Sequence, residues 1–210
     1  MSLFRIEASL FPTSSVTREL GDVVVSEWAA TTDDPTVTRR DLVTDPIPFH
    51  HWTAAVGAGE PAARDEALEA ARGLADELIA ADSLLFTFPL YNYGVPQQVK
   101  SWFDLAYTDP RIDPTGTALR GKPAVLVTAL GGNYDEGSPK HGWDHATPWM
   151  RRVLEDVWGL DLQVVRRSFT LVGVNPAMDR FAEHAAAAKA EAEADARRAG
   201  RHLAGVTARV

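Results

Sequence analysis

The chain alternates short apolar segments with longer segments in which apolar residues recur every three or four positions. Ser83–Phe88 and Ala124–Ala129 are apolar on both faces, which is typical of central strands in a parallel sheet. In Ala62–Ala81 the apolar residues fall three and four apart, which predicts an amphipathic helix. The same patterns predict strands at Leu3–Ala8, Thr36–Arg40 and Leu162–Leu171, and helices at Thr17–Ala30, Pro96–Tyr107, Ala146–Trp158 and from Asn175 to about Leu203.

Alternation of five strands with five helices defines the fold class. Such alternation predicts βαβ units, and these form a parallel sheet with helices on both faces. We therefore predict an α/β fold with a doubly wound five-stranded parallel sheet of flavodoxin-like order 2-1-3-4-5. The first strand fits this order poorly, because Arg5 and Glu7 alternate with apolar residues. That alternation indicates a half-exposed strand, whereas the order 2-1-3-4-5 places this strand inside the sheet. The sequence alone does not decide between the two.

Composition narrows the class of protein. The chain has 210 residues, of which 45% are hydrophobic and 24% charged, and its formal net charge is -8. These values are typical of a soluble protein with a single domain, here residues 1–210. The acidic balance argues against nucleic acid as a partner, because phosphate backbones are bound by clustered Lys and Arg. No apolar run approaches the roughly 20 residues of a membrane span, so we expect a cytoplasmic protein without membrane association.

Several kinds of reactive site are disfavoured by the residues present. The chain has no cysteine, which excludes a thiolate nucleophile and cysteine-ligated metals. The histidine clusters are His50 with His51, and His141 with His145. The second has the spacing of a helical zinc pair, but Gly142 and the loop-like composition disfavour a helix there, so we expect no metal.

Three loops follow predicted strands at the edge of the sheet where ligands of open α/β folds bind. The first runs from Ser9 to Thr17, includes Ser14 and Ser15, and leads directly into a helix. Its hydroxyls and the unpaired N–H groups of the first helical turn can bind a phosphate without Lys or Arg. The same residues also fit an ordinary Ser/Thr N-cap, and both interpretations remain open here.

The second and third loops carry aromatic residues and glycines. Between Phe88 and Pro96, two tyrosines and an Asn stand in a loop stiffened by prolines, on which a planar heterocycle can rest. The alternative is that these tyrosines are half-buried side chains with a hydrated hydroxyl. Gly131 and Gly132, after the fourth strand, permit close approach of the backbone to a ligand. The chain contains no GxGxxG or GxxxxGK[ST] motif, which argues against a dinucleotide clamp or a P-loop.

Taken together, these loops resemble a known family, the FMN-dependent NADH-azoreductases and NAD(P)H:quinone oxidoreductases. The resemblance runs over nearly the whole chain. It implies a flavodoxin-like fold, one FMN per subunit, NADH or NADPH as co-substrate, a quinone or azo compound as acceptor, and a homodimer. The motifs that carry the resemblance are Ser9 with Ser15-x-Thr17, Phe88-Pro-x-Tyr91-Asn92 ending at Pro96, and Gly131-Gly132.

The resemblance also implies a set of FMN-binding residues. By position, the residues that bind the phosphate are Ser9, Ser15, Val16 and Thr17. Those that contact the ring system are Leu90, Tyr91, Asn92 and Tyr93. Those that contact its far edge are Ala129, Leu130, Gly131 and Gly132. No side chain is obligatory for catalysis, and Tyr134 either donates a proton or walls the pocket. We expect ping-pong kinetics in which hydride passes from NAD(P)H through FMN to the acceptor. Backbone N–H groups of Gly131 and Gly132 would stabilise the negative charge of the reduced flavin.

An alternative function is that of a flavodoxin-type electron carrier, which binds FMN but has no NAD(P)H oxidoreductase activity of its own. Such carriers are usually smaller, and the Tyr91–Pro96 loop is more similar to that of the enzymes. The chain departs from the family at three places. Leu130 stands where many relatives carry Arg, Tyr134 stands where some carry His, and residues 104–120 differ from the stretch that borders the acceptor pocket. The resemblance therefore does not define the acceptor.

Overall fold

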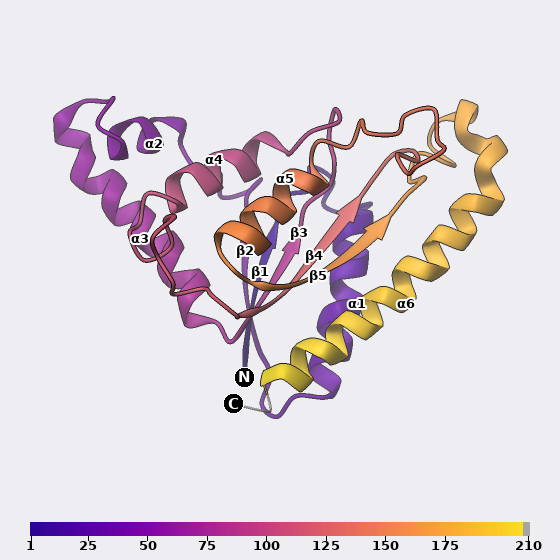
Figure 1. The fold of residues 1–210 in the computed structure, drawn as a ribbon, viewed down its shortest axis with the longest axis horizontal. Helices are drawn as coiled ribbons and strands as arrows, with labels where there is room; N and C mark the ends of the chain where they lie inside the picture. Colours follow the sequence, from indigo (N-terminus) through magenta and orange to yellow (C-terminus); the bar gives the residue numbers. More distant parts are fainter. Residues whose placement is uncertain (208–210) are drawn as a thin grey trace.

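A five-stranded parallel sheet forms the centre of the protein (Figure 1). The structure is a computed structural model that describes the backbone of residues 1–207 and the side chains of residues 1–205. The strands lie in the order β2-β1-β3-β4-β5, and each pair of neighbours is parallel. The predicted fold class and strand order are confirmed. The strands are β1 (Ser2–Glu7), β2 (Thr36–Asp41), β3 (Ser83–Thr87), β4 (Pro123–Ala129) and β5 (Asp161–Arg167).

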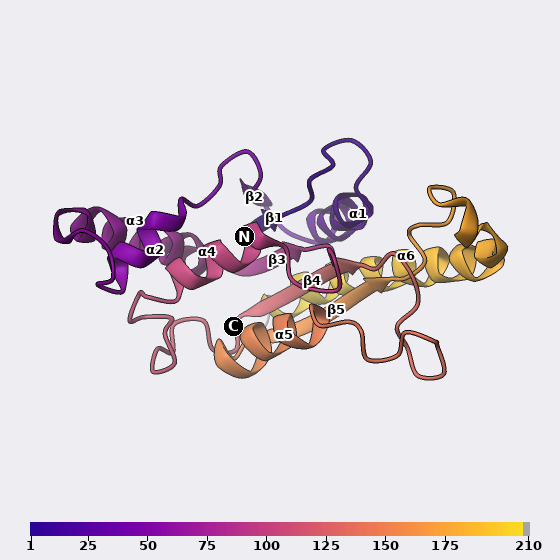
Figure 2. The same cartoon turned by 90° about the horizontal axis from the view of Figure 1, so that it is seen from above.

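Helices cover both faces of the sheet and enclose two separate apolar cores (Figures 1 and 2). One face packs against α1 (Val16–Ala30) and α6 (Ala182–Thr207). The other packs against α2 (Phe49–Ala55), α3 (Arg64–Ala80), α4 (Gln97–Ala106) and α5 (Thr147–Arg151). Strands β3 and β4 are buried along their whole length, as their continuous apolar sequence predicts.

The polar residues of β1 are buried in an ion-pair network beneath α1. Arg5 and Glu7 are only 1% and 4% exposed, and their side chains pair at 2.6 Å. Arg5 also binds Asp22 at 2.5 Å, while Arg18 binds Glu7 and, at 2.7 Å, Asp41. Buried charges are tolerated when they are paired in this way. The interpretation of these residues as signs of a half-exposed strand is therefore wrong.

Several element boundaries differ from the predicted ones. Helix α2 lies in a segment rich in Pro, Gly and His in which no helix was expected. Strand β5 ends at Arg167 instead of Leu171, because the chain then turns, with a positive φ of 61° at Phe169. Pro96 is the N-cap of α4 and does not lie in its first turn.

Two predicted helices are interrupted by other helical geometries. The segment predicted from Ala146 to Trp158 consists of α5 followed by a π-helical turn, Arg152–Val157. The C-terminal helix begins with a 3-10 turn, Pro176–Phe181, which Asn175 caps through its side chain. Within residues 1–207 no helix combines the length and apolar character that spanning a membrane requires.

Candidate functional site

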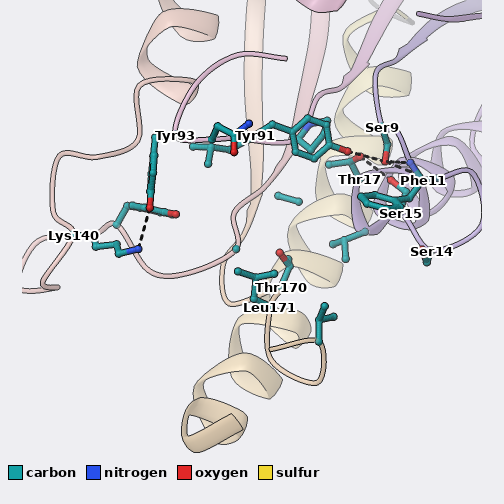
Figure 3. A pocket seen from close by; sticks show the side chains of 18 residues that line it. Ser9, Phe11, Ser14, Ser15, Thr17, Tyr91, Tyr93, Lys140, Thr170 and Leu171 are labelled. Carbon is teal, nitrogen blue, oxygen red and sulfur yellow. Dashed lines mark hydrogen bonds between the residues drawn. The ribbon is translucent and has the colours of Figure 1, made fainter. Parts of the chain in front are cut away.

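The three predicted loops meet in a cleft of about 520 Å³ at the carboxyl edge of the sheet (Figure 3). The cleft is formed by the segments that follow β1, β3, β4 and β5. The predicted residues that line it are Ser9, Ser15, Val16, Thr17, Leu90, Tyr91, Asn92, Tyr93, Ala129, Gly131 and Tyr134. Leu130 and Gly132 are not among the lining residues, so any contribution of these two would come from the backbone of the turn.

One end of the cleft is the start of α1. Ser15 caps this helix, because its hydroxyl accepts the N–H of Arg18 at 3.3 Å, and it lies 3.1 Å from the hydroxyl of Thr17. Among the described residues, the N–H groups of Val16 and Thr17 have no acceptor. Arg18 points away toward Glu7 and Asp41, so this end offers only hydroxyls and helix-terminal N–H groups. Such an arrangement binds a phosphate.

The wall after β3 is a two-residue hairpin with an unusual backbone. Tyr91 and Gly94 exchange two backbone hydrogen bonds, at 3.2 and 2.9 Å. The two residues between them, Asn92 and Tyr93, both have positive φ angles, of 49° and 67°. Primed turns require this conformation, which is costly for a tyrosine. The hydroxyl of Tyr91 accepts the N–H of Leu10 at 3.1 Å and so connects this wall to the first loop.

The opposite wall is formed by the glycine loop and the segment after β5. The backbone oxygens of Leu130, Gly131 and Gly132 accept N–H groups of residues 169–171. A Cβ at Gly131 would lie 2.8 Å from a methyl group of Leu171, so a larger residue here would require that side chain to move. The side chain of Leu130 is fully buried in the core. Within residues 1–207, the N–H groups of Gly131 and Gly132 have no protein acceptor and remain available to a ligand.

Aromatic side chains gather at the far end of the cleft. The ring of Tyr134 packs edge-on against that of Tyr93, with 6.2 Å between centroids. Burial raises the pKa of the Tyr134 hydroxyl, so the phenol stays protonated at neutral pH and can donate a hydrogen bond. Lys140 lies beside Tyr93, as Figure 3 shows, and is the one lining residue with a formal charge. In the described part of the chain, no three His, Asp or Glu residues are grouped to hold a metal.

Several lining residues were not predicted from the sequence. They are Phe11, Pro89, Lys140, Thr170, Leu171 and Val174. Thr170 and Leu171 were assigned to a strand that in fact ends earlier, and Lys140 follows the glycine loop at a distance that no local motif defines. Phe11 and Pro89 lie inside the loops already singled out. Their position next to those motifs is the only feature of the sequence that indicates a place in the cleft for Phe11 and Pro89.

Comparison with known proteins defines first the class of fold and then the family. A family model described as flavodoxin-like fold matches residues 1–196. An azoreductase from Bacillus anthracis has a similar structure, with a TM-score of 0.78 and 18% identity over 96% of this chain and 99% of its own.

Curated relatives of this chain carry the name FMN-dependent NADH:quinone oxidoreductase. The protein from Kineococcus radiotolerans is 39% identical, covering 96% of this chain and 99% of its own length. The protein from Frankia casuarinae is 35% identical, covering 93% and 96%. The chain belongs to this family of flavodoxin-like proteins.

Proposed function

We propose that this chain is an FMN-dependent oxidoreductase that transfers hydride from NADH or NADPH through FMN to a quinone or azo compound. The observation that carries the proposal is the cleft, in which an uncharged phosphate-binding helix terminus adjoins flat apolar and aromatic walls. The relatives named FMN-dependent NADH:quinone oxidoreductase support the same cofactor and donor. The redox chemistry is supplied by FMN when it is bound.

The residues of the cleft fit the two chemically different parts of FMN. The free N–H groups of Val16 and Thr17, with the hydroxyls of Ser9, Ser15 and Thr17, would hold the phosphate. Leu90, Tyr91, Asn92 and Tyr93 would contact the ring system on one side, and Ala129 with the Gly131 turn would contact its edge.

Three features of the chain would support hydride transfer. The available N–H groups of Gly131 and Gly132 would stabilise negative charge at the ring edge. Tyr134, the pKa of whose hydroxyl is raised by burial, would donate a hydrogen bond or wall the pocket. One face of the ring system would be open to the cleft, so donor and acceptor would bind there in turn. This arrangement favours a ping-pong mechanism in a single FMN-binding domain.

The test combines a binding measurement with steady-state kinetics. Purified protein is expected to release about one FMN per chain on heating, and to oxidise NADH or NADPH with a naphthoquinone or an azo dye. Double-reciprocal plots at several acceptor concentrations should give parallel lines, as ping-pong kinetics require. Intersecting lines would contradict the proposed order of binding. FMN binding without turnover would favour the electron carrier, and a protein that binds no FMN would contradict both functions.

A further inference from the structure

The charge distribution in the cleft is unusual for an acidic protein. The chain has a net charge of -8, yet none of the residues lining the cleft is a carboxylate. The one charged lining residue is Lys140. It lies at the end opposite Ser14 and Ser15, as Figure 3 shows, and so far from the place where the FMN phosphate would bind. A second anion-binding position is therefore available at the mouth of the cleft.

Lys140 differs from the other lysines of the chain in its surroundings. Lys100 pairs with Asp104 and Lys189 with Glu193, whereas Lys122 donates to backbone oxygens at the end of α3. Among the side chains that the structure describes, Lys140 forms no ion pair with a carboxylate.

Aromatic residues hold the ammonium group of Lys140 in place. Its Nζ donates to the hydroxyl of Tyr93 at 3.3 Å and lies 5.3 Å from the centre of that ring. The ring of Trp143 is 5.5 Å from the same nitrogen, and the two rings pack edge to face at 5.4 Å. These contacts orient the ammonium group without removing its charge. They also offer flat surfaces beside it.

We propose that Lys140, with the rings of Tyr93 and Trp143, is a recognition site for an anionic oxygen group on the substrate that enters the cleft beside FMN. The group is a phosphate, sulfonate or carboxylate attached to a planar or ring-bearing molecule. The inference rests on the proposed function and adds a specificity determinant to it. Two substrates could carry the anion: the nicotinamide dinucleotide through its phosphates, or an acidic aromatic acceptor.

The experiment compares charged and uncharged substrates in FMN-loaded wild type, Lys140→Gln, Lys140→Arg and Lys189→Gln. The acceptor pair is a naphthoquinone and its sulfonate. The donor pair is NADH and N-benzyl-dihydronicotinamide, which has no phosphate. Lys189→Gln is the matched control, because it removes one positive charge from the surface of α6, away from the cleft.

In Lys140→Gln we expect the ratio of kcat/KM for the anionic over the uncharged substrate to fall about twofold to fivefold in one pair. Lys140→Arg should restore the ratio, and 1 M salt should diminish it in wild type, because the Debye length is then only about 3 Å. A fall in the acceptor pair identifies an acidic acceptor, and a fall in the donor pair identifies the dinucleotide phosphates.

Fluorescence titration with the sulfonated quinone adds a readout independent of turnover. Quenching of tryptophan emission, to which Trp143 at the site contributes, should give a weaker affinity in Lys140→Gln than in wild type if the acceptor is the anion. Unchanged ratios in both pairs, or an equal fall in Lys189→Gln, would overturn this inference while wild-type turnover leaves the proposed function standing. A wild-type protein that neither binds FMN nor turns over would overturn both.

Discussion

At the scale of single residues, Ser15 has two roles that can be separated by substitution. Its hydroxyl caps α1 by accepting the N–H of Arg18, and it lies where the FMN phosphate is proposed to bind. Loss of a serine N-cap costs about 1 kcal/mol of stability. An aspartate at this position would preserve the cap but would place a negative charge beside the phosphate.

We therefore predict opposite outcomes for two substitutions. Ser15→Ala should lower the free energy of unfolding by about 1 kcal/mol and weaken FMN binding modestly. Ser15→Asp should leave the stability of the FMN-free protein near that of wild type, but raise the FMN dissociation constant by on the order of 100-fold or more. Urea unfolding and flavin fluorescence titration measure the two effects. Tight FMN binding by Ser15→Asp would show that the phosphate does not bind at the start of α1.

At the scale of elements, α1 and α6 pack closely on one face of the sheet. At Gly200 of α6, an added Cβ would lie 2.5 Å from the backbone oxygen of Val24 and 3.2 Å from the backbone nitrogen of Trp28. Backbone atoms cannot rotate away as a flexible side chain can. The two helices could therefore accommodate a larger residue only by moving apart.

Gly200→Ala should destabilise the protein by about 1–3 kcal/mol, although alanine has the higher helix propensity. Gly73→Ala in α3 is the control, because no atom lies within 4 Å of its added Cβ, and there the gain in propensity of up to about 1 kcal/mol should appear as stabilisation. Thermal or urea unfolding of both variants measures the difference. If Gly200→Ala were as stable as Gly73→Ala, the close packing of the two helices would be disproved.

The elements also show how far the sequence predicts the structure. The apolar runs of β3 and β4 predict central strands correctly, because burial on both faces leaves no place for polar residues. Strand β1 is also central but contains charged residues, because Arg5 and Glu7 form ion pairs with each other and with side chains of α1. The partners in α1, Arg18 and Asp22, lie 11 and 17 positions from the residues that they bind, so no local pattern indicates them.

The sequence likewise predicts only part of the candidate site, namely the residues that belong to local motifs. The loops that follow β1, β3 and β4 contain local sequence motifs, and most residues of these motifs line the cleft. Leu171 and Val174 come from a segment that leaves the sheet after β5 and bonds to the glycine loop. Lys140 owes its position to Tyr93, 47 positions earlier in the chain. Contacts of this kind arise only when the fold is complete.

At the scale of the whole molecule, large apolar side chains are exposed in two places, beside the cleft and at α2. Val174 is 74% exposed and Phe49 is 68% exposed, while Leu10, Phe11 and Val56 are each more than half exposed. Exposed apolar residues mark a binding surface where they lie together, so these two groups are candidates for one. The resemblance implies a homodimer, and these side chains are candidates for its interface.

We predict that the protein sediments with twice its chain mass of 22.9 kDa. Phe49→Asp places a charge on the exposed face of α2 and should shift the equilibrium toward monomer if this face is at the interface. Analytical ultracentrifugation measures the shift, and circular dichroism verifies that the variant remains folded. A wild-type protein that sediments at 22.9 kDa across micromolar concentrations would contradict the prediction.

The composition of the first loop has a consequence for acidity. Residues 9–17 contain no side chain that gains or loses a proton between pH 5 and pH 9, because they are serines, threonines, apolar residues and a proline. Amide dipoles and hydroxyls do not titrate in that range either. The strength with which this loop retains a phosphomonoester should thus follow the second ionisation of the ester alone, which occurs near pH 6. Over this range the interaction offered by the loop is constant, and acidification weakens binding at the loop by removing a charge from the ligand.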